Sequence, residues 1–155
     1  MIESYPEILR DAMSNEKQKI KMLTVQEANS LLPKVRLYLK TLREQRSVVL
    51  RTQAQIEIEE MTGTDPNGQL TLAAQAAIAK QMDAFHLQTK QFEEKLEDLY
   101  QLGAHLKDLD TGLVDFYSRR GQEIVFLCWK EGEAEIRHWH TLQSGFQNRK
   151  PLNGK

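Results

Sequence analysis

Apolar residues recur at helical spacing along two long stretches in the first two thirds of the chain. In the first stretch, the recurring positions run from residue 28 to residue 56 and are separated by four and three residues in turn. The recurring positions of the second stretch, from residue 78 to residue 99, have the same spacing. This repeat is typical of helices that pack along a shared stripe. We therefore predict two long helices, over residues 24–61 and 70–102.

Local signals mark the ends of these helices. Thr24, followed three residues later by Glu27, is a capping box that begins a helix. Residues 62–68 are turn formers, and Gly103 suits the end of the second helix. Pro33 lies inside the first helix and predicts a kink there. Because a short connection forces the two helices to lie antiparallel, we expect a coiled-coil-like helical hairpin.

After the second helix the apolar spacing changes from helical to alternating. Residues 113–117, 122–129 and 134–140 are rich in Val, Ile, Phe and Trp, and short turns that contain Gly separate them. Such segments are typical of strands joined by hairpins. The predicted fold class is therefore α+β: a long antiparallel helical hairpin followed by a three-stranded antiparallel meander.

Two-residue hairpins would place alternate residues of this meander on common faces. One face, expected to pack on the helices, would hold Val114, Phe116, Val125, Leu127, Trp129 and Ile136. The opposite face would carry Tyr117, Phe126 and Trp139 among its apolar residues. These side chains are too apolar for a comfortable monomer surface, so we expect contact with a second copy there and predict a homo-oligomer.

The length of the chain fits one domain. Of 155 residues, we assign 1–21 to a flexible N-terminal arm, 22–151 to the domain and 152–155 to a tail. The 21 basic residues nearly balance the 22 acidic ones, which argues against nucleic acid or a charged membrane as partner. A single cysteine excludes an intrachain disulfide and favours a cytoplasmic location.

Two histidines in the last predicted strand are the strongest candidates for metal ligands. His138 and His140 are two positions apart, so both rings would project from one face, and the assumed register places Glu123 opposite His140. Two imidazoles and a carboxylate can bind zinc or ferrous iron. Alternatively, both histidines close the end of the core through hydrogen bonds. In either case, we expect His140 to matter more than His138.

Four motifs follow one another in the order found in a known family. They are residues 23–33, residues 106–116, residues 127–133, and Trp139-His140 with Gly145-Phe146. Together they resemble the bacterial domain-of-unknown-function family 2203 over nearly the whole domain. The resemblance implies a bacterial, cytoplasmic protein and supplies no mechanism.

The sequence favours a non-catalytic protein-protein interaction or scaffolding module that self-associates through the helical hairpin and the outer face of the sheet. A long hairpin has a large surface relative to its core, which suits partner recognition. The sequence pattern does not bring together a nucleophile, a base and an orienting group. The alternative is a small metal-binding protein or metal-dependent enzyme that uses Glu123, His138 and His140.

Overall fold

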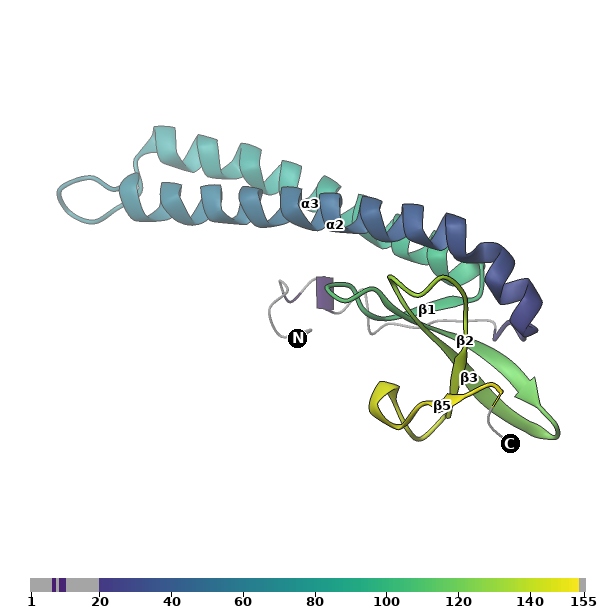
Figure 1. The fold of residues 1–155 in the computed structure, drawn as a ribbon. Coiled ribbons are helices and arrows are strands. Elements are labelled where there is room, and N and C mark those ends of the chain that lie inside the picture. The colour runs from purple at the N-terminus through teal and green to yellow at the C-terminus, as the bar shows by residue number, and fades with distance from the viewer. Residues whose placement is uncertain (1–6, 8, 11–19, 154–155) are drawn as a thin grey trace.

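Two long helices form the first part of the protein, as the sequence predicts. The computed structural model describes residues 7, 9, 10 and 20–153. Helix α2 spans Val25–Thr62, and the Thr24 side chain and Glu27 form the predicted capping box at its start. Helix α3 spans Leu72–Gln101 and is capped by the side chain of Thr71. Figure 1 shows them side by side, joined by a short connection.

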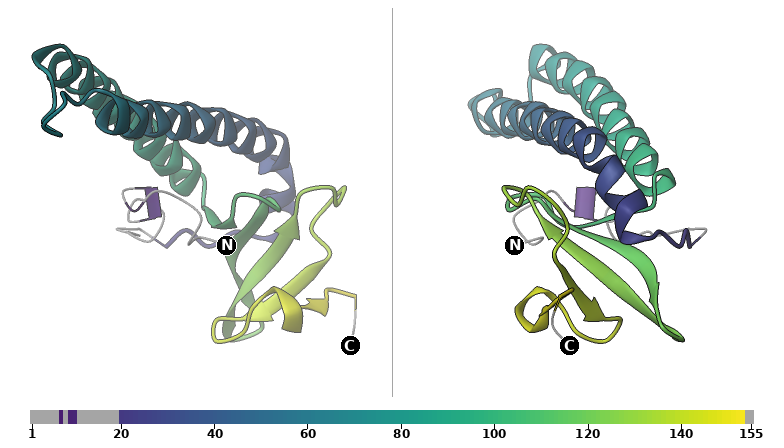
Figure 2. Two further views of the ribbon diagram at one scale, coloured as in Figure 1. Left: turned by 90° about the vertical axis from the view of Figure 1, so that its left-hand side faces the viewer. Right: turned by 45° about the vertical axis from the view of Figure 1, so that its right-hand side comes forward.

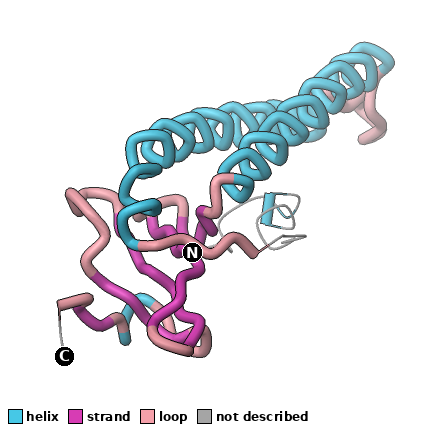
Figure 3. Tube along the Cα trace, turned by 90° about the vertical axis from the view of Figure 1, so that its right-hand side faces the viewer, coloured by secondary structure: helices cyan, strands magenta, loops and turns pink. Residues whose placement is uncertain are grey.

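The helices bury the predicted seam against each other and against the sheet. The buried apolar residues of the seam include Leu32, Val35, Leu39, Leu42, Val49, Phe92, Leu96 and Leu99. Toward the hairpin tip the seam opens, since Ile78 and Met82 are only half-buried and Leu72 is 84% exposed. The tip lies well away from the sheet in all views (Figures 1 and 3).

Helix α2 continues through Pro33 without a break. In Figures 1 and 2 its first turns are bent relative to the rest of the helix. A proline removes one backbone hydrogen bond and crowds the preceding turn, which accounts for a bend in this part of the helix.

The sheet has five antiparallel strands in the order β1-β2-β3-β4-β5, where three were predicted. Their bounds are Ala104–Asp108 for β1, Leu113–Arg120 for β2, Glu123–Lys130 for β3, His138–Thr141 for β4 and Lys150–Pro151 for β5. The helices cover one side of this sheet, here called the inner face (Figure 2). The predicted inner residues of β2 and β3, together with Ile136, are buried.

The pairing of β3 with β4 differs from the predicted register. A two-residue hairpin would have placed Glu135 opposite Cys128, whereas His138 occupies that position, which is a shift of three residues. A shift by an odd number exchanges the two faces of a strand. Consequently His138 and His140 lie on the outer face with Cys128, and Trp139 lies on the inner face opposite Leu127.

The segment after β4 lies on the outer side of the sheet. It contains the short helix η2, Phe146–Asn148, and strand β5, which lie away from the helices in Figure 1. Two cationic groups lie over the Phe146 ring, Lys130 at 5.4 Å and Arg149 at 4.3 Å from its centre. This segment of the same chain therefore covers part of the outer face, where the sequence predicted contact with a second copy.

The predicted N-terminal arm falls largely outside the described residues. Of its first nineteen positions, Glu7, Leu9 and Arg10 are described and helical. Leu9 is fully buried and belongs to the hydrophobic core, which is not expected of a loosely attached arm. None of the helices in the described part of the chain is long and apolar enough to cross a membrane.

Candidate functional site

The three residues predicted to bind metal do not come together. Glu123 pairs with Arg120 at the β2–β3 turn and is exposed. His140 instead pairs with Phe126, so the predicted juxtaposition of Glu123 and His140 is wrong. The two histidines do share the outer face, as their spacing required.

The partner of His140 is Asp115, from the far side of β3. The distance from His140 Nε2 to Asp115 Oδ2 is 2.9 Å, and both side chains are almost wholly buried. The Nδ1 atom of His140 lies 2.8 Å from the backbone oxygen of Thr141. An acidic residue inside a strand is unusual, so Asp115 stands out in the sequence.

These contacts determine the protonation of the histidine. A carbonyl oxygen only accepts, so His140 Nδ1 carries a proton and donates it to Thr141. The remaining nitrogen faces a carboxylate and donates to it when it is also protonated. The hydrogen bond to Asp115 raises the pKa of His140 above its ordinary value, although burial alone would lower it. The raised pKa favours the doubly protonated ring, which can form a buried ion pair with the Asp115 carboxylate.

Cys128 lies beside this pair on β3. It is the chain's one cysteine, is fully buried, and pairs with Asp115 in the β2–β3 register. Burial, and then the charge of Asp115, raise the pKa of Cys128 to about 12, while Arg149 acts in the opposite sense. The sulfur is therefore a thiol near neutral pH and a poor nucleophile. The observed pairing of β3 with β4 places its sulfur within 4.8 Å of a ring nitrogen of His140.

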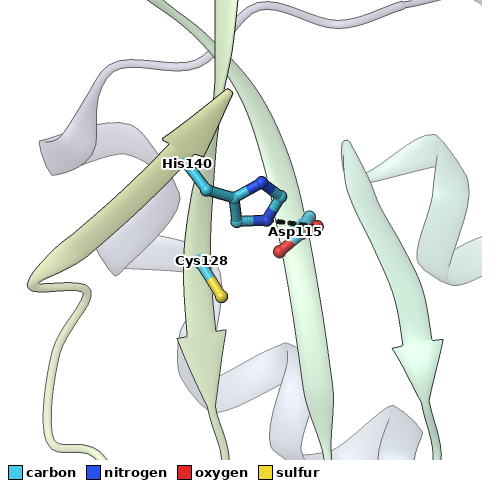
Figure 4. Close-up of side chains that lie close together, drawn as sticks. All are labelled: Asp115, Cys128 and His140. Atoms are coloured by element: carbon cyan, nitrogen blue, oxygen red, sulfur yellow. Dashed lines mark hydrogen bonds and ion pairs between the residues drawn. The ribbon is translucent and has the colours of Figure 1, made fainter. Parts of the chain in front are cut away.

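Figure 4 shows that Asp115, Cys128 and His140 project from three strands toward one point. One oxygen, the sulfur and one ring nitrogen all lie within 4.8 Å of one another. We call these three residues the outer-face cluster. Of its members, only His140 was among the predicted ligands, because the other two become neighbours only through the register.

A second group of polar side chains, formed by Glu133, His138 and Arg149, lies beside the cluster. Arg149 Nη1 lies 2.9 Å from Glu133 Oε1, and His138 Nδ1 lies 3.6 Å from Glu133 Oε2. Burial opposes ionisation of Glu133, yet hydrogen bonds from Arg149 and from the backbone of Lys130 lower its pKa. Glu133 is therefore an anion that balances the charge of Arg149.

The predicted contact residues Tyr117, Phe126 and Trp139 do not form one exposed patch. Tyr117 and Phe126 are in contact on the outer face, with tilted rings whose centres are 4.5 Å apart, and Phe126 is only 8% exposed. Trp139 lies on the inner face, where Arg120 and Lys150 approach its ring at 4.7 and 5.3 Å. A self-association surface built on these three residues is therefore poorly supported by their geometry.

Fold and cluster together define the class: an α+β protein in which a helical hairpin packs on a five-stranded antiparallel sheet that carries a buried Asp-Cys-His cluster. Residues 21–152 match the family described as "Uncharacterized conserved protein (DUF2203)", and the chain belongs to that family. No curated protein and no solved structure matches the chain.

Proposed function

We propose that this protein is a non-catalytic interaction module that self-associates through the exposed side of α2, with two copies of the helix antiparallel. The observation that carries this proposal is that α2 exposes Leu37, Ile58 and Met61 and has basic residues in its middle part and acidic ones at its end. Of the two predicted contact surfaces, the hairpin is favoured because Leu37 and Met61 on α2 are 64% and 80% exposed, whereas Phe126 on the outer sheet face is 8% exposed.

Large apolar side chains are exposed along α2. Leu37 is 64%, Ile58 51% and Met61 80% exposed, and Leu50 between them is also exposed. Ala54, Ile58 and Met61 follow one another in steps of four and three, the spacing of residues on one helical face. A stripe from residue 37 to residue 61 is about 36 Å long in a helix that rises 1.5 Å per residue. Such a stripe is long enough to pair with another helix.

The charges of α2 are divided between its two halves. Residues 34–51 carry six basic residues and one acid, whereas residues 52–62 carry three acids and no base. Acidic residues near a helix C-terminus are unfavourable to the helix itself. Their position is therefore better explained by a basic partner than by helix stability.

An antiparallel pair satisfies both patterns in nearly the same register. With the twofold axis close to residues 48 and 49, Met61 of one copy reaches Leu37 of the other. In that arrangement the exposed Glu57 comes within a residue of the exposed Lys40. Each contact occurs twice, as expected of a symmetric dimer.

The outer-face cluster supports the non-catalytic part of the proposal. Cys128, the chain's one thiol, stays protonated because its pKa is about 12. His140 is held by Asp115 and Thr141, so neither ring nitrogen is poised to take a proton from a nucleophile.

Light scattering on the purified protein tests this proposal. Wild type should have the mass of a dimer at micromolar concentration, and the double variant Ile58→Glu, Met61→Glu should have the mass of a monomer. Leu87→Glu is the matched control, since Leu87 is 59% exposed but lies on α3. This control should remain dimeric. A monomeric wild type, or equal dissociation by both variants, would refute the proposed surface.

A further inference from the structure

We propose that Asp115, Cys128 and His140 bind one divalent transition-metal ion of the zinc class. This site is independent of self-association through α2. It also differs from the set predicted from sequence, because Asp115 and Cys128 replace Glu123 and His138.

Strand pairing fixes the three side chains. Asp115 is directly opposite Cys128, and His140 is opposite Phe126, two residues from Cys128 on the same face. Their donor atoms lie within 4.8 Å of one another. Ligands in a tetrahedral zinc site are about 3.4 Å apart when each bond is about 2.1 Å long. Small side-chain rotations therefore suffice to bring all three donor atoms to an ion.

The hydrogen bond of His140 to the backbone orients the ring for coordination. Nδ1 donates to the oxygen of Thr141 at 2.8 Å, which directs Nε2 toward Asp115. Histidines that bind metals commonly donate their second ring N–H to a carbonyl or carboxylate in this way. His140 therefore has the backbone hydrogen bond that is common among metal-binding histidines. Its other ring nitrogen, Nε2, faces the side chains of Asp115 and Cys128 (Figure 4).

One oxygen of the aspartate points independently to a ligand. Asp115 is 3% exposed, and its Oδ1 atom has no hydrogen-bond partner among the residues that the structure describes. A buried carboxylate oxygen without a partner is costly. A metal ion bound between Asp115 and Cys128 would interact with this oxygen and offset the cost of burying it.

The charges of the site suit a divalent cation. Binding displaces the proton of His140 Nε2 and the thiol proton of Cys128, and both protons pass to solvent. The ligands are then one neutral imidazole, one thiolate and one carboxylate, which neutralise the two charges of the ion. Nitrogen and sulfur donors favour zinc over calcium or magnesium. Arg149 is paired with Glu133 at 2.9 Å and also interacts with the Cys128 side chain, which favours the thiolate form of this ligand.

Titration of the wild-type protein with Co²⁺ and then Zn²⁺ tests the site directly. Cys128 is the chain's one thiol, so a sulfur-to-cobalt charge-transfer band at one equivalent would report this sulfur alone. Zn²⁺ should displace the cobalt and remove the band. A wild-type protein without such a band would overturn the proposal, whether or not any variant folds.

Variants then test the identity of the ligands. Cys128→Ser and His140→Ala should each lower Zn²⁺ affinity by more than about tenfold, because even outer contacts of a metal site are worth that much. His138→Ala and Glu123→Gln are the matched controls and should bind as wild type does, with folding checked by circular dichroism. A loss in either control equal to that of Cys128→Ser, or unchanged binding in all four variants, would refute this ligand set.

Discussion

His140 and Asp115 tie two strands together across a third. Their side chains are 3% and 4% exposed, so the ion pair is shielded from water. Removal of one member of such a pair leaves the other charge buried without compensation, at a cost of about 3–5 kcal/mol. Loss of either member should therefore destabilise the sheet whether or not the cluster binds an ion.

Substitution of His140 should thus cost more than substitution of His138. His140→Ala is expected to lower the free energy of unfolding by about 3 kcal/mol. The loss for His138→Ala should stay within about 1 kcal/mol, because its contact with Glu133 is longer and partly exposed. Urea unfolding at one fixed protein concentration measures both values, and equal losses would contradict this account of the pair.

The same pair predicts a dependence of stability on pH. The hydrogen bond to Asp115 raises the pKa of His140 in the folded protein above the ordinary 6.5. Its stabilising effect is therefore fully present below pH 6.5 and is lost as the pH rises through the higher folded-state value. With a chelator present, the stability difference between wild type and His140→Ala should shrink with rising pH. A difference that stays constant or grows would argue against an imidazolium at this position.

At the scale of elements, the helices were predictable and part of the sheet was not. The capping box and the regular apolar repeat are local signals, and they place both helices within two residues of their observed ends. Strand β5 has only two residues. Strand β1 follows α3 almost directly and has five residues, too few for its alternation to stand out from the end of the helix.

The register of β4 depends on contacts that the sequence pattern does not reveal. In the loop before it, the carboxylate of Glu133 accepts from the backbone of Lys130 at 2.7 Å, and the Glu133 backbone oxygen accepts from the Trp129 ring at 2.9 Å. Asn29, far away in the chain, accepts from the backbone of Ile136 at 2.7 Å. Without this loop the partner of His140 could not be identified, although His140 itself could be singled out.

The capping box of α2 offers a test of the local signals. Thr24→Ala removes the side-chain oxygen that accepts from the backbone of Glu27 at 3.1 Å. We expect the free energy of unfolding to fall by about 1 kcal/mol. Thr24→Ser keeps the hydroxyl and should resemble wild type, and chemical denaturation compares the two. If the alanine variant matched wild type, the cap would contribute nothing to stability.

On the scale of the whole molecule, the hairpin extends beyond the sheet that anchors it (Figure 3). Its proximal part packs into the common core through Leu32, Val35 and Leu39. Its distal part exposes Ile58 and Met61. This division leaves the exposed side of α2 available to a second copy, with the sheet as a rigid base.

Charge reversal on α2 tests the proposed antiparallel dimer most directly. Sedimentation equilibrium at low salt would compare Lys40→Glu alone, Glu57→Lys alone and an equimolar mixture of the two. Each variant alone brings like charges together twice and should weaken dimerisation about tenfold, since each reversal costs up to ~1 kcal/mol. In the mixture every contact again joins opposite charges, so the account predicts that dimerisation returns to the wild-type level. A mixture that associates no more tightly than the separate variants would contradict it.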